Sequence, residues 1–220
     1  MTQAVVLQKS FIVAGHPRSG TSLACRLVSG GGVEFPSDFE GDQYNRDGYF
    51  ELRESKELSK RLLEKAMTEE NTQLMNKIVR RLNSIEGRSG LKLVRIPAFF
   101  FYRHIAKNLK ALFIFRNPAN VKASLFKRGI GTFPISWLKN NNALIAAYEN
   151  CEQSIIVSYE SLLNRETHLE AGFQKLGLNV DFECIKKSCQ TQKDSRIYVT
   201  QDEINLYERL KELEKESCEG

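Results

Sequence analysis

Four short apolar runs divide the chain into alternating segments. Residues 11–15 (FIVAG), 91–96 (LKLVRI), 111–116 (ALFIFR) and 154–159 (SIIVSY) are rich in β-branched and aromatic residues. Near-continuous apolar strands that are separated by helical segments are typical of a parallel sheet covered on both faces. The pattern therefore predicts an α/β protein with three layers, α/β/α, and a mainly parallel central sheet.

Helical periodicity fills most of the chain between and after these runs. Helices are expected at residues 21–28, 54–85, 135–150, 165–176 and 201–217. The first two strands are separated by a loop and helical insertion at about 34–90, in which residues 34–53 are polar and aromatic and predict an ordered loop. Since no repeat or linker interrupts the pattern, we interpret residues 1–220 as a single domain.

The first apolar run leads into a turn with the spacing of a phosphate-binding loop. Residues 15–22 read Gly-His-Pro-Arg-Ser-Gly-Thr-Ser, so that GxxxxG is followed by two hydroxyl residues at a predicted helix start. Backbone N–H groups and the positive end of the helix dipole favour anions at such a place. Thr21 stands where nucleotide-binding loops carry a lysine, which weakens a small P-loop kinase as an alternative. Arg18 supplies a positive charge from inside the loop.

A second candidate anion site follows the third apolar run. Arg116 lies at the carboxyl end of this run, where α/β sheets bind ligands. Pro118 suits the first turn of the helix that follows. Ser124 lies eight residues after Arg116 on that helix, and Arg128 lies one helical turn beyond Ser124. The segment therefore combines a strand-end cation with a hydroxyl and a second cation on the next helix.

These two segments resemble the donor-binding elements of PAPS-dependent sulfotransferases, closest in pattern to bacterial sulfotransferase-like proteins. This family takes a sulfuryl group from 3′-phosphoadenosine-5′-phosphosulfate (PAPS) and releases adenosine 3′,5′-bisphosphate (PAP). HPRSGTS is similar to its 5′-phosphosulfate loop, FIFRNPANVKASLFKR to its 3′-phosphate element, and SIIVSYESLL to a strand whose tyrosine lies near the adenine. The resemblance implies a P-loop NTPase-like sulfotransferase fold. It also implies that the donor is bound by Pro17, Arg18, Ser19, Gly20, Thr21, Ser22, Arg116, Ser124, Arg128 and Tyr159.

The proton acceptor is less clearly marked. Many cytosolic members of the family use a histidine after the second strand, but residues 93–98 (LVRIPA) contain neither histidine nor carboxylate. Residues 45–51 (NRDGYFE) resemble an Asn-x-x-Gly-aromatic-Phe-Glu signature of bacterial sulfotransferase-like proteins. This resemblance makes Glu51 the first candidate for the general base, and Glu40 the second. Arg95 stands where the family commonly carries a lysine, and with Arg18 it is a candidate to face the sulfuryl group.

Composition and charge argue against nucleic acid, a membrane or a metal as partners of this chain. The formal charge is +5, but no block of basic residues points to nucleic acid, and no apolar run reaches the roughly 20 residues that a membrane helix needs. The five cysteines and three histidines show no metal-ligand spacing, so no metal is expected. The first residues do not resemble a signal peptide, so a cytoplasmic location is expected.

The acceptor is expected to be a small molecule or a carbohydrate. Aromatic residues in segments 35–50 and 99–102 are candidates for lining its pocket. An alternative function is a non-catalytic protein that binds PAP or another nucleotide on the same scaffold.

Overall fold

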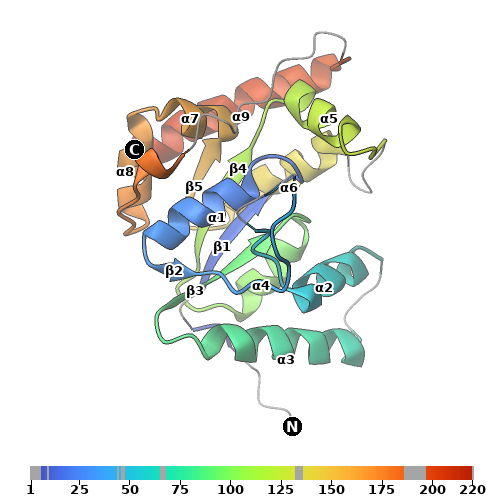
Figure 1. Cartoon of the computed structure of the whole chain (residues 1–220), viewed down its shortest axis with the longest axis vertical. Helices are drawn as coiled ribbons and strands as arrows, with labels where there is room; N and C mark the ends of the chain where they lie inside the picture. Colours follow the sequence, from blue (N-terminus) through green and yellow to red (C-terminus); the bar gives the residue numbers. More distant parts are fainter. Residues whose placement is uncertain are drawn as a thin grey trace.

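The computed structural model describes residues 6–8, 10–43, 45, 48–64, 68–131, 136–185 and 197–219. At its centre lies a sheet in which all neighbouring strands are parallel (Figure 1). In spatial order the strands are β2 (Val33–Glu34), β3 (Arg88–Leu93), β1 (Ser10–Gly15), β4 (Lys110–Phe115) and β5 (Gln153–Ser158). Three of the four longer strands coincide with apolar runs to within one residue, whereas β3 begins three residues before the run at 91–96 and ends at Leu93. The predicted parallel sheet is confirmed.

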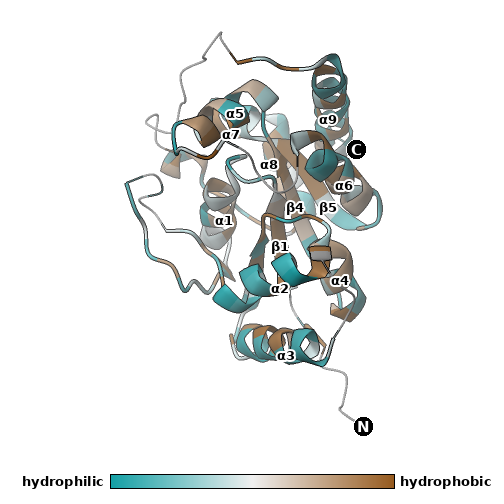
Figure 2. Cartoon of the chain, turned by 90° about the vertical axis from the view of Figure 1, so that its right-hand side faces the viewer, coloured by the Kyte–Doolittle hydropathy of each residue, from teal (hydrophilic) through white to brown (hydrophobic). Residues whose placement is uncertain are grey.

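Helices cover both faces of the sheet and confirm the three-layer architecture. Phe11 and Val13 of β1 enter one core, and Ile12 of the same strand enters the other. The first core is covered by α1 (Thr21–Gly30), α7 (Tyr159–Asn164) and α8 (His168–Lys175). The second is covered by α2 (Arg53–Glu64), α3 (Glu69–Asn83), α4 (Ala98–Ile105), α5 (Pro118–Phe126) and α6 (Trp137–Glu149). Figure 2 shows apolar strands between these helices, with polar residues on the helices around them.

The last helix, α9 (Gln201–Glu219), closes the outer edge of the sheet beside β5. The backbone N–H of Ile156 donates to Ser217 Oγ (3.2 Å), and that of Ser158 donates to Glu214 Oε1 (2.7 Å). The Ser217 hydroxyl also lies 3.2 Å from the Ile156 carbonyl oxygen. These side chains satisfy backbone groups that an edge strand otherwise exposes.

Among the described residues, the insertion contains the expected loop between β2 and α2, but its helical region is not continuous. The helical region 54–85 consists of two helices, α2 and α3, which pack against each other; residues 65–67 lie outside the described part of the chain. Thr68 begins α3 because its side chain accepts a hydrogen bond from Asn71 N (3.2 Å). The start of the insertion also contributes β2, a two-residue edge strand that is too short for an alternation pattern to reveal.

A second difference concerns the end of β5. Tyr159, which the apolar run assigned to a strand, is the first residue of α7, because the Ser158 side chain caps this helix by accepting from Ser161 N (2.9 Å). The helix expected at 165–176 is α8, which begins at His168.

Both cores pack against this one sheet. The single-domain interpretation of residues 1–220 stays a prediction. In the described part of the chain, no helix is long and apolar enough to cross a membrane.

Candidate functional site

The loop between β1 and α1 has the backbone that a phosphate cradle requires. Arg18 and Gly20 adopt positive φ angles of 70° and 89°, and α1 begins directly afterwards at Thr21. A Cβ atom at Gly20 would lie 2.2 Å from the Tyr159 ring, so only glycine fits there. Ser19 is fully buried, and its hydroxyl has no hydrogen-bond partner among the described residues. The glycine spacing seen in the sequence is therefore dictated by the loop conformation.

The two predicted anion-binding segments meet in space. Arg18 Nε donates to Ser124 Oγ of α5 (3.1 Å), and Arg116 Nη1 donates to the Arg18 carbonyl oxygen (2.9 Å). Arg116 follows β4 directly and is almost completely buried. Its guanidinium carbon lies 4.2 Å from the centre of the Tyr159 ring, a stacking distance. Four of the candidate residues, from three separate segments, thus form one cluster at the carboxyl end of β1 and β4.

The cluster concentrates positive charge. Burial lowers the pKa of Arg18, and the nearby charges of Arg128 and Arg116 lower it further, against the opposing effect of Tyr49. Burial also lowers the pKa of Arg116. Arginine keeps its charge in spite of such shifts. Like charges held together in a partly buried place favour the binding of an anion between them.

Arg128 links this cluster to the loop that precedes α2. Its Nη2 atom lies 3.3 Å from the Tyr49 hydroxyl and 3.9 Å from Asp42 Oδ1. The Tyr49 hydroxyl in turn donates to Asp42 Oδ2 (2.5 Å). Arg128 is therefore held against the loop that carries the candidate bases, next to Arg18.

Glu51 belongs to a buried network around Lys92, a residue that the sequence analysis did not single out. Lys92 Nζ donates to Ser22 Oγ (3.0 Å) and to the Tyr49 carbonyl oxygen (2.6 Å), and pairs with Glu51 Oε1 (3.0 Å). The Lys92 side chain is 3% exposed, and that of Glu51 is 14% exposed. Asn45 Nδ2 also donates to Ser22 Oγ (2.9 Å). Asn45 therefore contacts Ser22, the second residue of α1, directly, while Tyr49 and Glu51 are connected to it through Lys92.

In the described part of the chain, the side chains of Glu40, Asp38 and Arg95 are not part of the hydrogen-bond network around Lys92. Glu40 is exposed and forms no hydrogen bond or ion pair with the described residues. Asp38 accepts from Arg53 N (2.9 Å) at the start of α2 and pairs with Arg81, which gives it a structural role. Arg95 lies in the turn between β3 and α4, where its carbonyl oxygen accepts from Ala98 N (3.1 Å).

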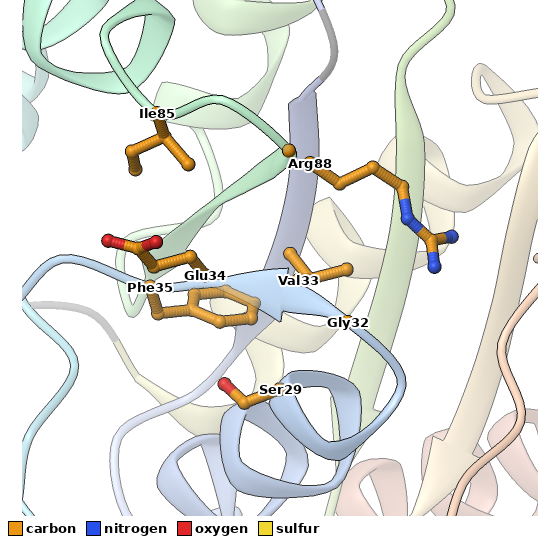
Figure 3. A pocket seen from close by; sticks show the side chains of 8 residues that line it. Ser29, Gly32, Val33, Glu34, Phe35, Ile85 and Arg88 are labelled. Carbon is orange, nitrogen blue, oxygen red and sulfur yellow. The ribbon is translucent and has the colours of Figure 1, made fainter.

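One expectation about the acceptor pocket changes. Phe99 and Tyr102, proposed as pocket-lining residues, are fully buried in the core and are not available to an acceptor. A cavity of about 440 Å³ lies at the amino end of β3, opposite the phosphate loop (Figure 3). It is lined by Ser29, Gly32, Val33, Glu34, Phe35, Ile85, Gly87 and Arg88. The Arg88 guanidinium is committed to the carbonyl oxygens of Gly31 and Gly177.

Comparison with known proteins identifies the fold. No protein-family model and no curated protein sequence matches the chain. Among solved structures, the sulfotransferase domain from the curacin biosynthetic pathway superposes with a TM-score of 0.56 at 12% identity, over 94% of this chain and 98% of that one. The sulfotransferase domain of the Synechococcus PCC 7002 olefin synthase gives 0.55 at 16% identity, over 96% and 97%. The chain therefore has the sulfotransferase fold.

A weaker likeness is to mouse sulfotransferase SULT7A1 complexed with PAP. Its TM-score is 0.43 at 11% identity, over 92% of this chain and 64% of that one. The assignment of the fold depends on the two full-length superpositions alone.

Proposed function

We propose that this protein is a sulfotransferase that moves a sulfuryl group from PAPS to a hydroxyl or amine of an acceptor and releases PAP. The proposal is supported above all by the contact between the two predicted phosphate-binding segments, in which Arg18 donates to Ser124 and Arg116 donates to Arg18. A ligand with phosphates at two ends of one nucleoside suits two adjacent cationic elements. The sulfotransferase fold is consistent with this assignment.

The residues of the cluster divide the proposed work. Gly20, Thr21 and Ser22 would hold the 5′-phosphate at the start of α1, while Arg116 and Ser124 would hold the 3′-phosphate. Tyr159 would contact the adenine. In the transfer, the acceptor oxygen bonds to sulfur as the bond from sulfur to the bridging oxygen breaks. Arg18 would stabilise the charge that develops on that oxygen, and the acceptor proton would pass to Glu51.

A Mg²⁺-dependent kinase is the weaker assignment, because Lys92 lies at the hydroxyl that would bind the metal. In nucleotide-binding loops this hydroxyl is a Mg²⁺ ligand, and Ser22 holds that position here. Mg²⁺ sits about 2.1 Å from its oxygen ligands. Since the Lys92 ammonium is 3.0 Å from Ser22 Oγ, a cation on the same oxygen would be strongly repelled.

One observation favours the non-catalytic alternative. Glu51 Oε1 is engaged by Lys92, and Oε2 lies 3.8 Å from Lys56, so both oxygens of the candidate base face cations. A nucleotide-binding protein on this scaffold would need no base. The acceptor, which we propose to be a small molecule or a carbohydrate, and the cytoplasmic location stay predictions.

Ligand-dependent melting tests the proposal. PAP should raise the melting temperature more than AMP or adenosine 3′-monophosphate, because only PAP engages both phosphate sites. Saturation at about 100 times the dissociation constant stabilises by about 2.7 kcal/mol. Equal shifts from PAP and AMP would contradict the 3′-phosphate site. Transfer from labelled PAPS to a panel of sugars and simple alcohols then separates the enzyme from the non-catalytic alternative, which predicts tight PAP binding without turnover.

A further inference from the structure

We infer that Lys92 is a positioning residue that, together with Asn45, fixes the Ser22 hydroxyl as a hydrogen-bond donor toward the 5′-phosphate. This inference rests on the proposed function, since it concerns how that site recognises its anion. It assigns a role to a lysine in the middle of a buried strand.

The ammonium group of Lys92 is fully committed. A lysine ammonium has three N–H donors and no acceptor. Here three acceptors surround it, namely Ser22 Oγ, the Tyr49 carbonyl oxygen and Glu51 Oε1, at 3.0, 2.6 and 3.0 Å. Such a group is held in one orientation, because each donor has its own partner.

The consequence falls on Ser22. A serine hydroxyl has one hydrogen and two acceptor lone pairs. Lys92 Nζ and Asn45 Nδ2 both donate to Ser22 Oγ, at 3.0 and 2.9 Å, and together they use both lone pairs. The remaining hydrogen-bonding capacity of Ser22 is donation. Ser22 is the second residue of α1, where the backbone N–H groups already favour an anion.

This arrangement makes the site selective for an anion over a cation. A hydroxyl that can only donate accepts an anionic oxygen and rejects a cation or a hydrogen-bond donor. The positive charge of Lys92 strengthens the effect, since hydrogen bonds that involve ionised groups are roughly twice as strong as neutral ones. Lys92 lies on the face of the sheet that α1 covers. It pairs in register with Val13, which belongs to the core under α1, whereas its neighbours Leu91 and Leu93 face the opposite core.

The test is a double-mutant cycle between Lys92→Met and Ser22→Ala, read as the dissociation constant of PAP by calorimetry. All variants carry Glu51→Gln, so that removing Lys92 leaves no unpaired buried carboxylate. Where Ser22 is present, Lys92→Met should weaken PAP by up to about 10- to 100-fold, the full contribution of a hydrogen bond to a charged group. In the Ser22→Ala background the same change should have little effect.

Adenosine 3′-monophosphate is the matched control ligand, because it lacks the phosphate that Ser22 would contact. Its affinity should not change in Lys92→Met. Lys92→Arg, which keeps a charged donor, should recover part of the affinity for PAP, and it serves as the test pair with Lys92→Gln if Lys92→Met does not fold. Lys92→Gln should then bind PAP more weakly than Lys92→Arg when Ser22 is present.

Three results decide the matter. Coupling between positions 92 and 22 that is confined to PAP supports the inference. Equal losses of PAP affinity with and without Ser22 would overturn it and would mean that Lys92 acts by charge or packing alone, while the proposed function stands. Failure of the protein to bind PAP, with Glu51 or with Glu51→Gln alone, would overturn both the inference and the proposed function.

Discussion

Replacing Arg116 with alanine should weaken PAP binding far more than it destabilises the free protein. The side chain is 5% exposed, donates to the Arg18 carbonyl oxygen and stacks on Tyr159. Removing Arg116 loses these contacts. It also relieves repulsion between two guanidinium groups: burial and Arg128 lower the pKa of Arg18 most, and the charge of Arg116 lowers it further. The two effects oppose each other in the unliganded protein. With PAP bound, the loss of the contact to the 3′-phosphate is added to these effects.

The expected size follows from the phosphate contact. A hydrogen bond to a charged group contributes about 1.5–3 kcal/mol, and a loss of about 2 kcal/mol raises the dissociation constant about 30-fold. At a PAP concentration about 100 times the wild-type dissociation constant, the ligand stabilises wild type by about 2.7 kcal/mol. The variant should then gain only about 0.9 kcal/mol.

Chemical denaturation with and without PAP measures both quantities. Arg209→Ala is the matched control, since it removes the same charge from an exposed position on α9. It should leave the PAP-dependent gain unchanged. An unchanged gain in Arg116→Ala, or an equal reduction in both variants, would refute the assignment of Arg116 to a bound phosphate.

Two further predictions test the base and the loop. Glu51→Gln keeps the shape of the side chain and an acceptor for Lys92 but removes proton acceptance. Turnover of PAPS should therefore fall by about 10²–10⁴-fold in a steady-state assay, while PAP affinity stays near wild type. Turnover at the wild-type rate would assign the general base to another carboxylate. Gly20→Ala should destabilise the folded protein by about 2 kcal/mol or more, because a Cβ there combines a positive φ of 89° with a contact of 2.2 Å to Tyr159. Gly30→Ala is the control, since its Cβ would meet open space, and it should leave the melting temperature unchanged or raise it.

The sequence was informative where a single local rule decides the structure. Three apolar runs, and the first half of the run at 91–96, became strands because strands buried on both faces are mostly apolar. The turn before α1 was recognised because its backbone requires glycine at Gly20, where φ is 89°. Pro118 was predicted in the first turn of a helix, and it is the first residue of α5. Asn117 caps this helix, and its side chain accepts from Ala119 N (3.0 Å). Each of these features depends on a few consecutive residues.

Features that depend on contacts across the chain were missed or misplaced. Lys92 was read as part of an apolar strand, although a charged residue inside such a strand is almost never buried without a partner. That signal alone predicts a buried acceptor, but its identity depends on the loop before α2, which supplies Tyr49 and Glu51. The division between α2 and α3 was missed for a different, local reason: its signal is the cap at Thr68, whose effect depends on backbone geometry.

The position of Lys92 bears on how a phosphate loop works without its usual lysine. In nucleotide-binding loops one lysine at the helix start contacts the phosphates directly. Here Thr21 takes that place, and the charge comes from two residues: Arg18 inside the loop and Lys92 on the strand below. Arg18 faces Ser124, whereas Lys92 is enclosed by protein acceptors and reaches the loop only through Ser22. In the proposed site, Arg18 would thus face the ligand, whereas Lys92 would fix the Ser22 hydroxyl as a hydrogen-bond donor. Such a division suits a transferred anion that needs no metal partner, because the hydroxyl that would bind a metal is already held by a positive charge.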